Sequence, residues 1–338
     1  MGDVVHSLSA LERARALWPR AELWWAVERL AAPLLEGHPA LDGFVVLERK
    51  EATHSLSALR RTLGGIGRLR GQRFDAAIDL QGLLRSALVA RASGARRVLG
   101  PSWAREGARF LYSDRLQVPR PGEAHAVERY LRGIEAAHLA LGDAAPPPRL
   151  APEGPRPRLP EGLRAGRSER PRLILLVGAG KPANRLPPQL LAKVADACAA
   201  STEDLDVLVL GGPDDAERAR ALRAHAQVAV ETRCSGDLAG SARLLSSAWA
   251  VLGGDTGPLH LARVLGVPTL GLFPAADPAR TGPRGIPGPA WTATLPGLAP
   301  CSPCLAKRCQ RPGGVRICLD GLRATELAEQ LRPHLQPR

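Results

Sequence analysis

Short apolar runs alternate with amphipathic and turn-rich stretches along most of the chain, a pattern that indicates buried strands separated by helices. In the first half, the predicted strands are residues 21–27, 43–48, 74–80 and 96–100. In the second half, they are residues 172–178, 206–212, 228–231, 250–254 and 268–273. This alternation predicts an α/β fold whose parallel sheets are covered by helices.

The two halves flank a Pro-rich stretch, residues 142–172. Proline fixes φ and lacks an N–H donor, so such a stretch forms neither a helix interior nor a central strand. We therefore predict two domains, residues 1–142 and 172–324, joined by a linker at 143–171. Residues 325–338 contain an amphipathic stretch, 325–335, which predicts a closing helix. Two such domains suggest a ligand cleft between them, at the carboxyl ends of their strands.

The chain opens on a predicted helix. Asp3 stands where an N-cap would, and apolar residues then follow at roughly helical spacing. Doubly wound domains are built from units in which a strand comes before the helix. The first strand of the N-terminal domain is therefore expected to be missing.

The formal net charge is +13, from 46 Lys and Arg against 33 Asp and Glu. Such an excess suits a polyanionic partner or an anionic membrane surface. Nucleic acid is not expected, because aromatic residues make up 4% of the chain and no basic run is interleaved with them. No apolar run reaches membrane-spanning length and no signal sequence is recognisable, so we expect a cytoplasmic protein.

Residues 249–273 carry the most informative motif. A predicted strand ends in two glycines, Asp255 and Thr256 follow, and Gly257 opens a predicted helix. A helix N-terminus presents unpaired N–H groups, which can bind a diphosphate. His260 lies in the first turn of this helix, where its imidazole could reach the bound anion. The alternative is that Asp255 or Thr256 only caps the helix.

This motif resembles that of glycosyltransferase family 9, the ADP-heptose:lipopolysaccharide heptosyltransferases. Asp255, Thr256, Gly257 and His260 match the family pattern D-[ST]-G-x-x-H. Residues 74–100 and 125–142 are similar to the family's N-terminal domain. Heptosyltransferase-II-like members of the family have a cluster of cysteines similar to that of residues 301–318 in this chain.

The resemblance implies a GT-B fold, in which two Rossmann-like, doubly wound domains face a cleft. The N-terminal domain would bind the acceptor, a lipid-linked core oligosaccharide. The C-terminal domain would bind ADP-heptose or a similar nucleotide-sugar, and the sugar would be transferred with inversion. The expected location is the cytoplasmic face of the inner membrane, where excess Arg could attract anionic lipid. No catalytic cofactor is implied, because basic groups and a helix terminus can replace Mg²⁺ at the diphosphate.

The resemblance also implies roles for residues near the chain start and in the loop 177–191. Asp3 corresponds to the family's general base, which would take the acceptor's proton. In the family a strand and two loop serines come before this position, which supports the expected loss of a first strand and a start codon assigned at an internal Met. Asn184 occupies the position of a family Lys, so Lys181 or Arg185 would supply the cation at the diphosphate. Without the resemblance, a solvated loop is the preferred interpretation of these two basic residues.

Asp215 follows the predicted strand 206–212 and aligns with a ribose-binding acid of the family. An acidic residue there can accept hydrogen bonds from ribose hydroxyls. The alternative is that it only stabilises a helix N-terminus.

Four cysteines follow one another closely in the C-terminal domain: Cys301, Cys304, Cys309 and Cys318. In a cytosolic chain, such spacing favours a tetrahedral structural zinc site over disulfides. Buried free thiols are the alternative. Cys198 and Cys234 lie on apolar elements and are predicted core residues.

Two other classes of function are weighed against the glycosyltransferase. A nucleotide-sugar-binding protein that no longer catalyses is favoured by Asn184 and by the expected missing strand. A dehydrogenase is disfavoured because no G-x-G-x-x-G sequence opens a strand–helix–strand unit.

Overall fold

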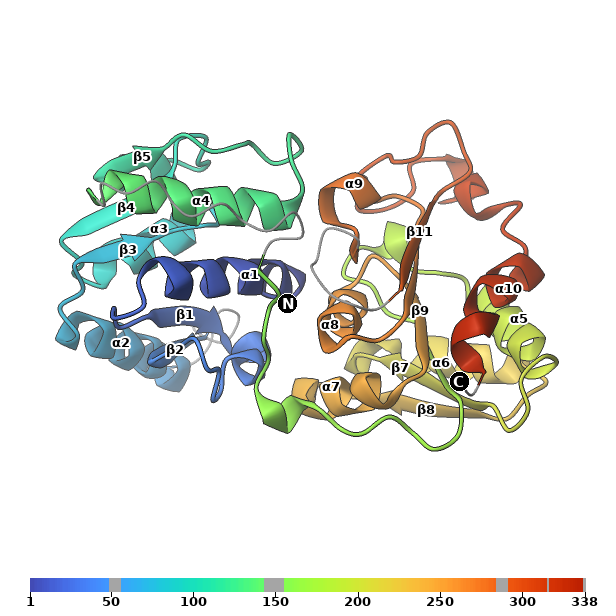
Figure 1. Cartoon of the computed structure of the whole chain (residues 1–338). Coiled ribbons are helices and arrows are strands. Elements are labelled where there is room, and N and C mark those ends of the chain that lie inside the picture. Colours follow the sequence, from blue (N-terminus) through green and yellow to red (C-terminus); the bar gives the residue numbers. More distant parts are fainter. Residues whose placement is uncertain (49–55, 143–154, 284–290, 315, 337–338) are drawn as a thin grey trace. The chain divides into compact units, whose positions relative to one another are not determined.

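The computed structural model describes residues 1–48, 56–142, 155–283, 291–314 and 316–336 (Figure 1). Contacts divide the chain into two compact units. The C-terminal unit contains Met1–Val5 and Glu161–Arg338, and the N-terminal unit contains His6–Pro160. Both units contain parallel strands with helices between them, which confirms the predicted α/β class.

The C-terminal unit contains a six-stranded parallel sheet in the order β11-β10-β9-β6-β7-β8. Its strands are β6 (Arg172–Leu176), β7 (Asp206–Gly211), β8 (Val230–Cys234), β9 (Ala250–Gly254), β10 (Thr269–Phe273) and β11 (Thr292–Pro296). The strand order reverses between β6 and β9. At such a reversal the connections leave toward opposite faces, so a crevice opens at the carboxyl ends of the two central strands.

Helices cover both faces of this sheet (Figure 1). One face packs on α5 (Pro188–Ala199), α6 (Ala216–His225) and α10 (Ala324–Leu335), and the other is covered by α7 (Leu238–Ser247) and α8 (Gly257–Leu265). Successive strand residues point to opposite faces, so both Leu173 and Ile174 of β6 are fully buried. The predicted closing helix is confirmed as α10, which buries Leu327 and Leu331 against the sheet core.

The strands of the N-terminal unit form two separate parallel sheets. One pairs β1 (Trp24–Glu28) with β2 (Gly43–Leu47), and the other has the order β3 (Ala76–Ile78), β4 (Arg97–Pro101), β5 (Asp114–Leu116). The helices are α1 (Gly2–Leu17), α2 (Leu56–Gly71), α3 (Leu84–Ala92) and α4 (Ala126–Ala140). Ala10 and Ala14 of α1 pack on α4 in one apolar cluster.

Three edge strands differ from the sequence prediction. The strand expected at 228–231 is β8, which begins at Val230 and ends at Cys234, while β5 and β11 were not predicted. Half-exposed and exposed residues alternate in β8, and every residue of β11 is at least partly exposed. Edge strands tolerate polar side chains, so a search for apolar runs does not find them.

The expected N-cap role of Asp3 is wrong. Helix α1 begins at Gly2, and the N–H groups of Val4 and Val5 donate to the Met1 carbonyl over 3.0 and 3.1 Å. Asp3 therefore lies inside the first turn, where its carboxylate interacts favourably with the helix dipole.

The strands of the N-terminal unit are less buried than predicted. Val27 is the buried residue of β1, all three residues of β3 are partly exposed, and all residues of β9 and β10 are buried. Within the described residues, β1 and β3 each hydrogen-bond to one neighbouring strand. Each of these two strands has one edge without a partner strand among the described residues, and both strands are partly exposed. Their backbone amides should therefore be less protected from hydrogen exchange.

We expect hydrogen exchange to distinguish the two units. Backbone amides of β1 and β3 should exchange faster than those of β9 and β10, because half-exposed strands open without global unfolding. Mass spectrometry of the exchanged protein would measure this, with β6 of the same chain as the protected reference. Equal protection of all these strands would contradict the expectation.

A buried polar cluster joins α1 to the segment that precedes the C-terminal unit. His38 is 3% exposed; its Nδ1 accepts from the Ala40 N–H (3.1 Å) and its Nε2 lies 3.0 Å from the Arg158 carbonyl oxygen. This pattern requires a neutral imidazole that donates through Nε2. Burial lowers the pKa of His38 below its ordinary value of 6.5, and the nearby Glu12 carboxylate opposes this shift. Glu12 also forms a bidentate ion pair with Arg158, with distances of 2.7 to 3.0 Å.

The lowered pKa predicts acid sensitivity. As pH falls below 6.5, His38 takes up a proton in the unfolded chain while the folded chain resists it, so the free energy of unfolding decreases. His38→Gln keeps a donor for the Arg158 carbonyl and removes the titration. Thermal unfolding at about pH 7.5 and about pH 5.5 should show a smaller loss for this variant than for the wild type. An equal loss in both would assign the acid sensitivity to other groups.

Candidate active site

The Asp255 turn lies at the carboxyl end of β9, next to the reversal of strand order. Asp255 Oδ1 is 3.1 Å from Nε2 of His260, whose side chain is almost fully buried in α8. Gly254 comes just before this turn. A Cβ at that position would overlap the carbonyl oxygen of Asn184, so glycine allows the loops after β6 and β9 to approach each other. Thr256 occupies the N-cap position of α8 without a side-chain cap bond.

Asn184 holds the other side of the Asp255 carboxylate. It ends the short helix η5 (Pro182–Asn184) and is 2% exposed. Its Nδ2 donates to Asp255 Oδ2 over 3.2 Å, and its Oδ1 accepts from the Ala276 N–H over 3.1 Å. The carboxylate is therefore fixed between an amide and an imidazole, at the point where a ligand is expected in this type of sheet.

Arginine side chains surround the loop that follows β6. Arg185 is half-buried and donates to the Ala179 carbonyl over 3.2 Å, whereas Lys181 is exposed. Arg218 of α6 donates to the carbonyls of Val177 (3.0 Å) and Leu186, and Arg316 donates to the Arg185 carbonyl. Burial lowers the pKa of Arg218, and the positive charges of Arg185 and Arg316 lower it further, while Asp215 opposes them. An anion bound here would relieve the repulsion among these guanidinium groups.

Asp215 ends the short helix η6 (Pro213–Asp215), just after β7. It is 8% exposed, and its Oδ2 accepts from the Gly212 N–H over 3.0 Å. Its Oδ1 is buried and has no hydrogen-bond partner among the described residues. The carboxylate lies close against Gly178 at the end of β6, where a side chain would overlap it. A buried acceptor without a donor is costly, so this oxygen is suited to a ligand hydroxyl.

Asp3 is exposed in the first turn of α1. The first five residues belong to the C-terminal unit, in which Gly2 lies beside the imidazole of His260: a Cβ on Gly2 would be 3.8 Å from His260 Cδ2. The sequence analysis named Asp215, Asp255 and His260 as candidate site residues, and it named neither Arg218 nor Arg316, which the structure places beside them. Arg218 stands three residues after Asp215, a helical spacing that could have indicated it. No spacing in the sequence indicates Arg316, which comes from a distant loop.

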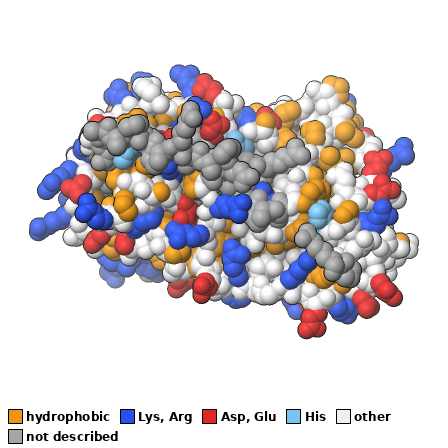
Figure 2. All heavy atoms as spheres, viewed as in Figure 1, with side chains coloured by type: hydrophobic (Ala, Val, Ile, Leu, Met, Phe, Trp, Pro, Cys, Tyr) orange, Lys and Arg blue, Asp and Glu red, His pale blue; other side chains and the backbone are white. Residues whose placement is uncertain are grey.

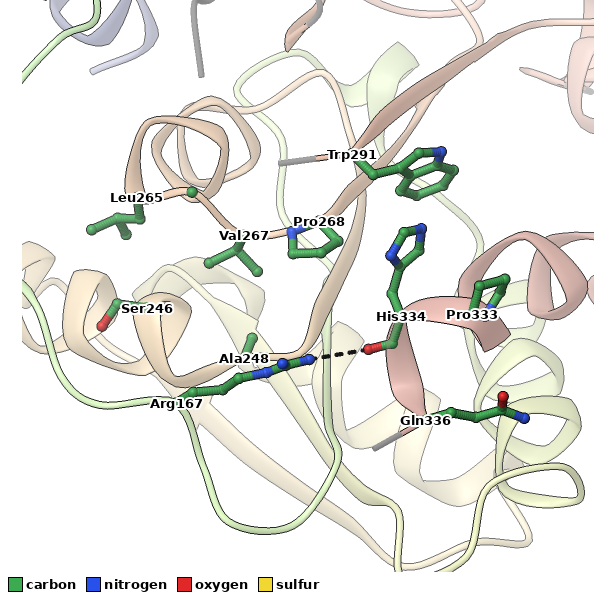
Figure 3. A pocket seen from close by; sticks show the side chains of 11 residues that line it. Arg167, Ser246, Ala248, Leu265, Val267, Pro268, Trp291, Pro333, His334 and Gln336 are labelled. Atoms are coloured by element: carbon green, nitrogen blue, oxygen red, sulfur yellow. Dashed lines mark hydrogen bonds between the residues drawn. The ribbon is translucent and has the colours of Figure 1, made fainter. Parts of the chain in front are cut away.

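A hollow in the C-terminal unit lies away from this site (Figure 3). It measures about 380 Å³, and its lining includes Ala248, Pro268 and Trp291, which come just before β9, β10 and β11. It therefore lies at the amino ends of the strands. Arg167 donates to the His334 carbonyl there (3.3 Å), and the Trp291 and His334 rings stack 4.4 Å apart. Ligands of open parallel sheets bind at the opposite, carboxyl edge.

The structure does not support the expected zinc site at the four clustered cysteines. Cys301 and Cys304 are exposed, Cys309 and Cys318 are half-buried, and none of these four is in a disulfide within the described structure. No three His, Cys, Asp or Glu residues in the described ranges are arranged to hold a metal ion. The loop is held instead by hydrogen bonds such as Leu298 N–H to the Cys318 carbonyl (2.9 Å) and Ser302 Oγ to the Pro274 carbonyl (2.9 Å).

Cys198 is buried in the sheet core, as predicted, and Cys234 is half-buried beside it. Burial raises the pKa of Cys198 to about 12.

These environments predict the order of thiol reactivity. At about pH 8, Cys301 and Cys304 should react first with an aromatic disulfide reagent, and Cys198 should react only after unfolding. Cys198→Ala should remove one slow equivalent and leave the fast phase unchanged. Fast reaction that appears only after a metal chelator is added would contradict this order and restore the metal site.

No helix in the part of the chain that the structure describes is long and apolar enough to cross a membrane. Lys and Arg side chains are spread over the face shown in Figure 2, with Asp and Glu side chains among them. Among the residues that the structure describes on this face, positive charge is therefore distributed and mixed with negative charge.

Known proteins resemble this chain in sequence and in fold. Residues 65–313 match the model of glycosyltransferase family 9 (heptosyltransferase). Lipopolysaccharide heptosyltransferase 1 of Pseudomonas aeruginosa is 32% identical over 91% of this chain and 84% of its own length. A protein of the same name from Escherichia coli K12 is 28% identical over 84% of this chain and 88% of its own length.

Among solved structures, ADP-heptose lps heptosyltransferase II of E. coli has a TM-score of 0.74 at 22% identity and covers 99% of this chain and 95% of its own. Heptosyltransferase WaaC of E. coli, solved with ADP, has a TM-score of 0.72 at 23% identity and covers 99% and 97%. These likenesses show a GT-B fold with Rossmann-like domains. By its family match and its 32% identical relative, this chain belongs to glycosyltransferase family 9 and is a glycosyltransferase.

Proposed function

We propose that this protein transfers a heptose from ADP-heptose to the inner core of lipopolysaccharide, with inversion at the anomeric carbon. The names of its relatives support the donor and acceptor classes. The observation that carries the proposal is the Asp255–His260 pair at the start of α8, because it lies at the carboxyl edge beside the reversal of strand order.

The donor would bind across the ends of β6, β7 and β9. Asp215 would accept a hydrogen bond from a ribose hydroxyl through its free Oδ1. The start of α8 would receive the diphosphate through the backbone N–H groups of Thr256 and Gly257, because Pro258 has no N–H and the Leu259 N–H donates to the Thr256 carbonyl (3.1 Å). Arg185 or Lys181 would stabilise the negative charge that grows on the departing ADP.

Asp3 would act as the general base. The acceptor hydroxyl oxygen forms a bond to the anomeric carbon as the bond from that carbon to the diphosphate oxygen breaks, and the hydroxyl proton passes to the Asp3 carboxylate. ADP leaves with the electron pair of the broken bond. The exposure of Asp3 and the assignment of residues 1–5 to the C-terminal unit support this role.

We further propose that the protein acts at the cytoplasmic face of the inner membrane, as a peripheral protein. The acceptor carries negative charges on a membrane surface, and the net charge of +13 would attract it.

The rival function is that of a protein that binds the nucleotide-sugar without transferring the sugar. The neutral Asn184, at a position where the family has a basic residue, favours that rival.

Asp3→Asn separates the two functions. It should lower the rate of heptose transfer to a deacylated lipopolysaccharide core by about 10² to 10⁴ and leave the affinity for ADP-heptose unchanged, because a general base acts only in the chemical step. Glu22→Gln, which removes an exposed carboxylate outside the site, should behave as the wild type. A wild-type chain that binds ADP-heptose and transfers none would establish the rival. Transfer unaffected by Asp3→Asn would exclude Asp3 as the base.

A further inference from the structure

The Asn184 side chain is more enclosed than that of a residue that binds a diphosphate would be. It is 2% exposed, and both ends of its amide are used inside the protein. The oxygen meets a backbone N–H and the nitrogen meets a carboxylate, the one amide orientation that satisfies both neighbours. Asn184 therefore has no polar atom directed at solvent in the described structure, and it can act on a ligand only through the residues it holds.

The residue it holds is Asp255. One oxygen of that carboxylate takes the Asn184 amide and the other takes the His260 imidazole, over 3.2 and 3.1 Å. Two fixed partners on opposite oxygens set both the position and the plane of the carboxylate. The Asp255 side chain is 19% exposed, compared with 3% for His260. Asp255 is thus the member of this trio that reaches the crevice, and its remaining lone pairs are available there.

A carboxylate is a strong acceptor for hydroxyl groups and is repelled by a diphosphate. We propose that Asn184 is a positioning residue for the donor sugar: its amide orients Asp255 so that the outer lone pairs of the carboxylate accept hydrogen bonds from sugar hydroxyls. This proposal rests on the proposed function and assigns Asn184 to the sugar, whereas the family resemblance places a diphosphate-binding cation at this position.

The neighbouring arginines explain how position 184 can have an amide where the family has a cation for the diphosphate. Arg185, Arg218 and Arg316 surround the adjacent loop, with Asp215 as the carboxylate that opposes them at Arg218. These three side chains supply positive charge at the edge of the sheet without residue 184. The site therefore separates two tasks: guanidinium groups attract the diphosphate, and the Asn184 amide orients the acceptor of sugar hydroxyls.

The chain offers a direct probe, because Asn184 is its only asparagine. Labelling with [15N]asparagine therefore gives a single side-chain amide signal in nuclear magnetic resonance spectra of the full chain. ADP-heptose should shift this signal, because the sugar hydroxyls bind the carboxylate that the amide contacts. ADP alone, which lacks the sugar, should shift it several-fold less. A shift with ADP as large as that with ADP-heptose would overturn the proposal in favour of diphosphate binding.

Binding measurements on a variant supply the second readout. Asn184→Leu should weaken ADP-heptose binding about tenfold to a hundredfold and leave ADP affinity within about twofold, because only the sugar contact is lost. Gln189→Leu, which removes an exposed amide on α5, should change neither affinity. Equal weakening of ADP and ADP-heptose by Asn184→Leu would overturn the positioning role.

Both readouts measure binding, so they are independent of transfer. A chain that shows the difference between ADP-heptose and ADP but transfers no heptose contradicts the proposed function and supports the role of Asn184. A chain that transfers heptose without this difference contradicts the role of Asn184 and leaves the proposed function intact. The labelled wild-type protein keeps the test decisive if Asn184→Leu does not fold.

Discussion

The carboxyl edge of the C-terminal unit depends on the two contacts of the Asp255 carboxylate, one with the Asn184 amide and one with the His260 imidazole. Asn184 also accepts from the Ala276 N–H, so the side chains of Asp255 and Asn184 together join the loops that follow β6, β9 and β10, three adjacent strands of one parallel sheet. That approach requires glycine at position 254, because a side chain would overlap the backbone of Asn184. The buried strands from which these loops leave supply a rigid base, so the polar groups of Asn184, Asp255 and His260 lie at fixed positions before any ligand binds.

The N-terminal unit is held together differently. Its strands form two separate sheets with partly exposed members, and charged pairs tie distant segments to one another. Arg13 of α1 pairs with Glu135 of α4 (2.8 Å), Glu12 pairs with Arg158 (2.7 Å), and Arg85 of α3 pairs with Glu28 of β1 (2.6 Å). The side chains of Arg13 and Glu12 are 5% and 8% exposed, so removing the partner of either leaves a buried charge uncompensated. The side chains of Arg85 and Glu28 are both much more exposed, so their pair contributes little. The pairs of Arg13 and Glu12 therefore contribute to holding the segments of this unit together.

The central strands were predictable because both of their faces are buried. Residues 250–254 and 268–273 are continuous apolar runs, and the structure places β9 and β10 there. The edge strand β11 was missed because its side chains meet solvent. The Asp255–His260 pair was predictable because a helix start and a turn are local features of the sequence. The contact of Asn184 with Asp255 joins positions 71 residues apart, and only the arrangement of the strands brings them together. The expected zinc site is not supported because cysteine spacing does not determine where a loop directs its thiols.

The central claim is that the nucleotide-sugar binds at the carboxyl edge of the C-terminal sheet. Hydrogen exchange of the full chain with and without saturating ADP tests this claim most directly, because it locates the bound nucleotide without a substitution. The account predicts slower exchange in the segments 177–186, 211–217 and 254–262, and no change around the hollow at residues 265–268 and 331–336. Protection confined to that hollow, or to the N-terminal unit, would contradict it.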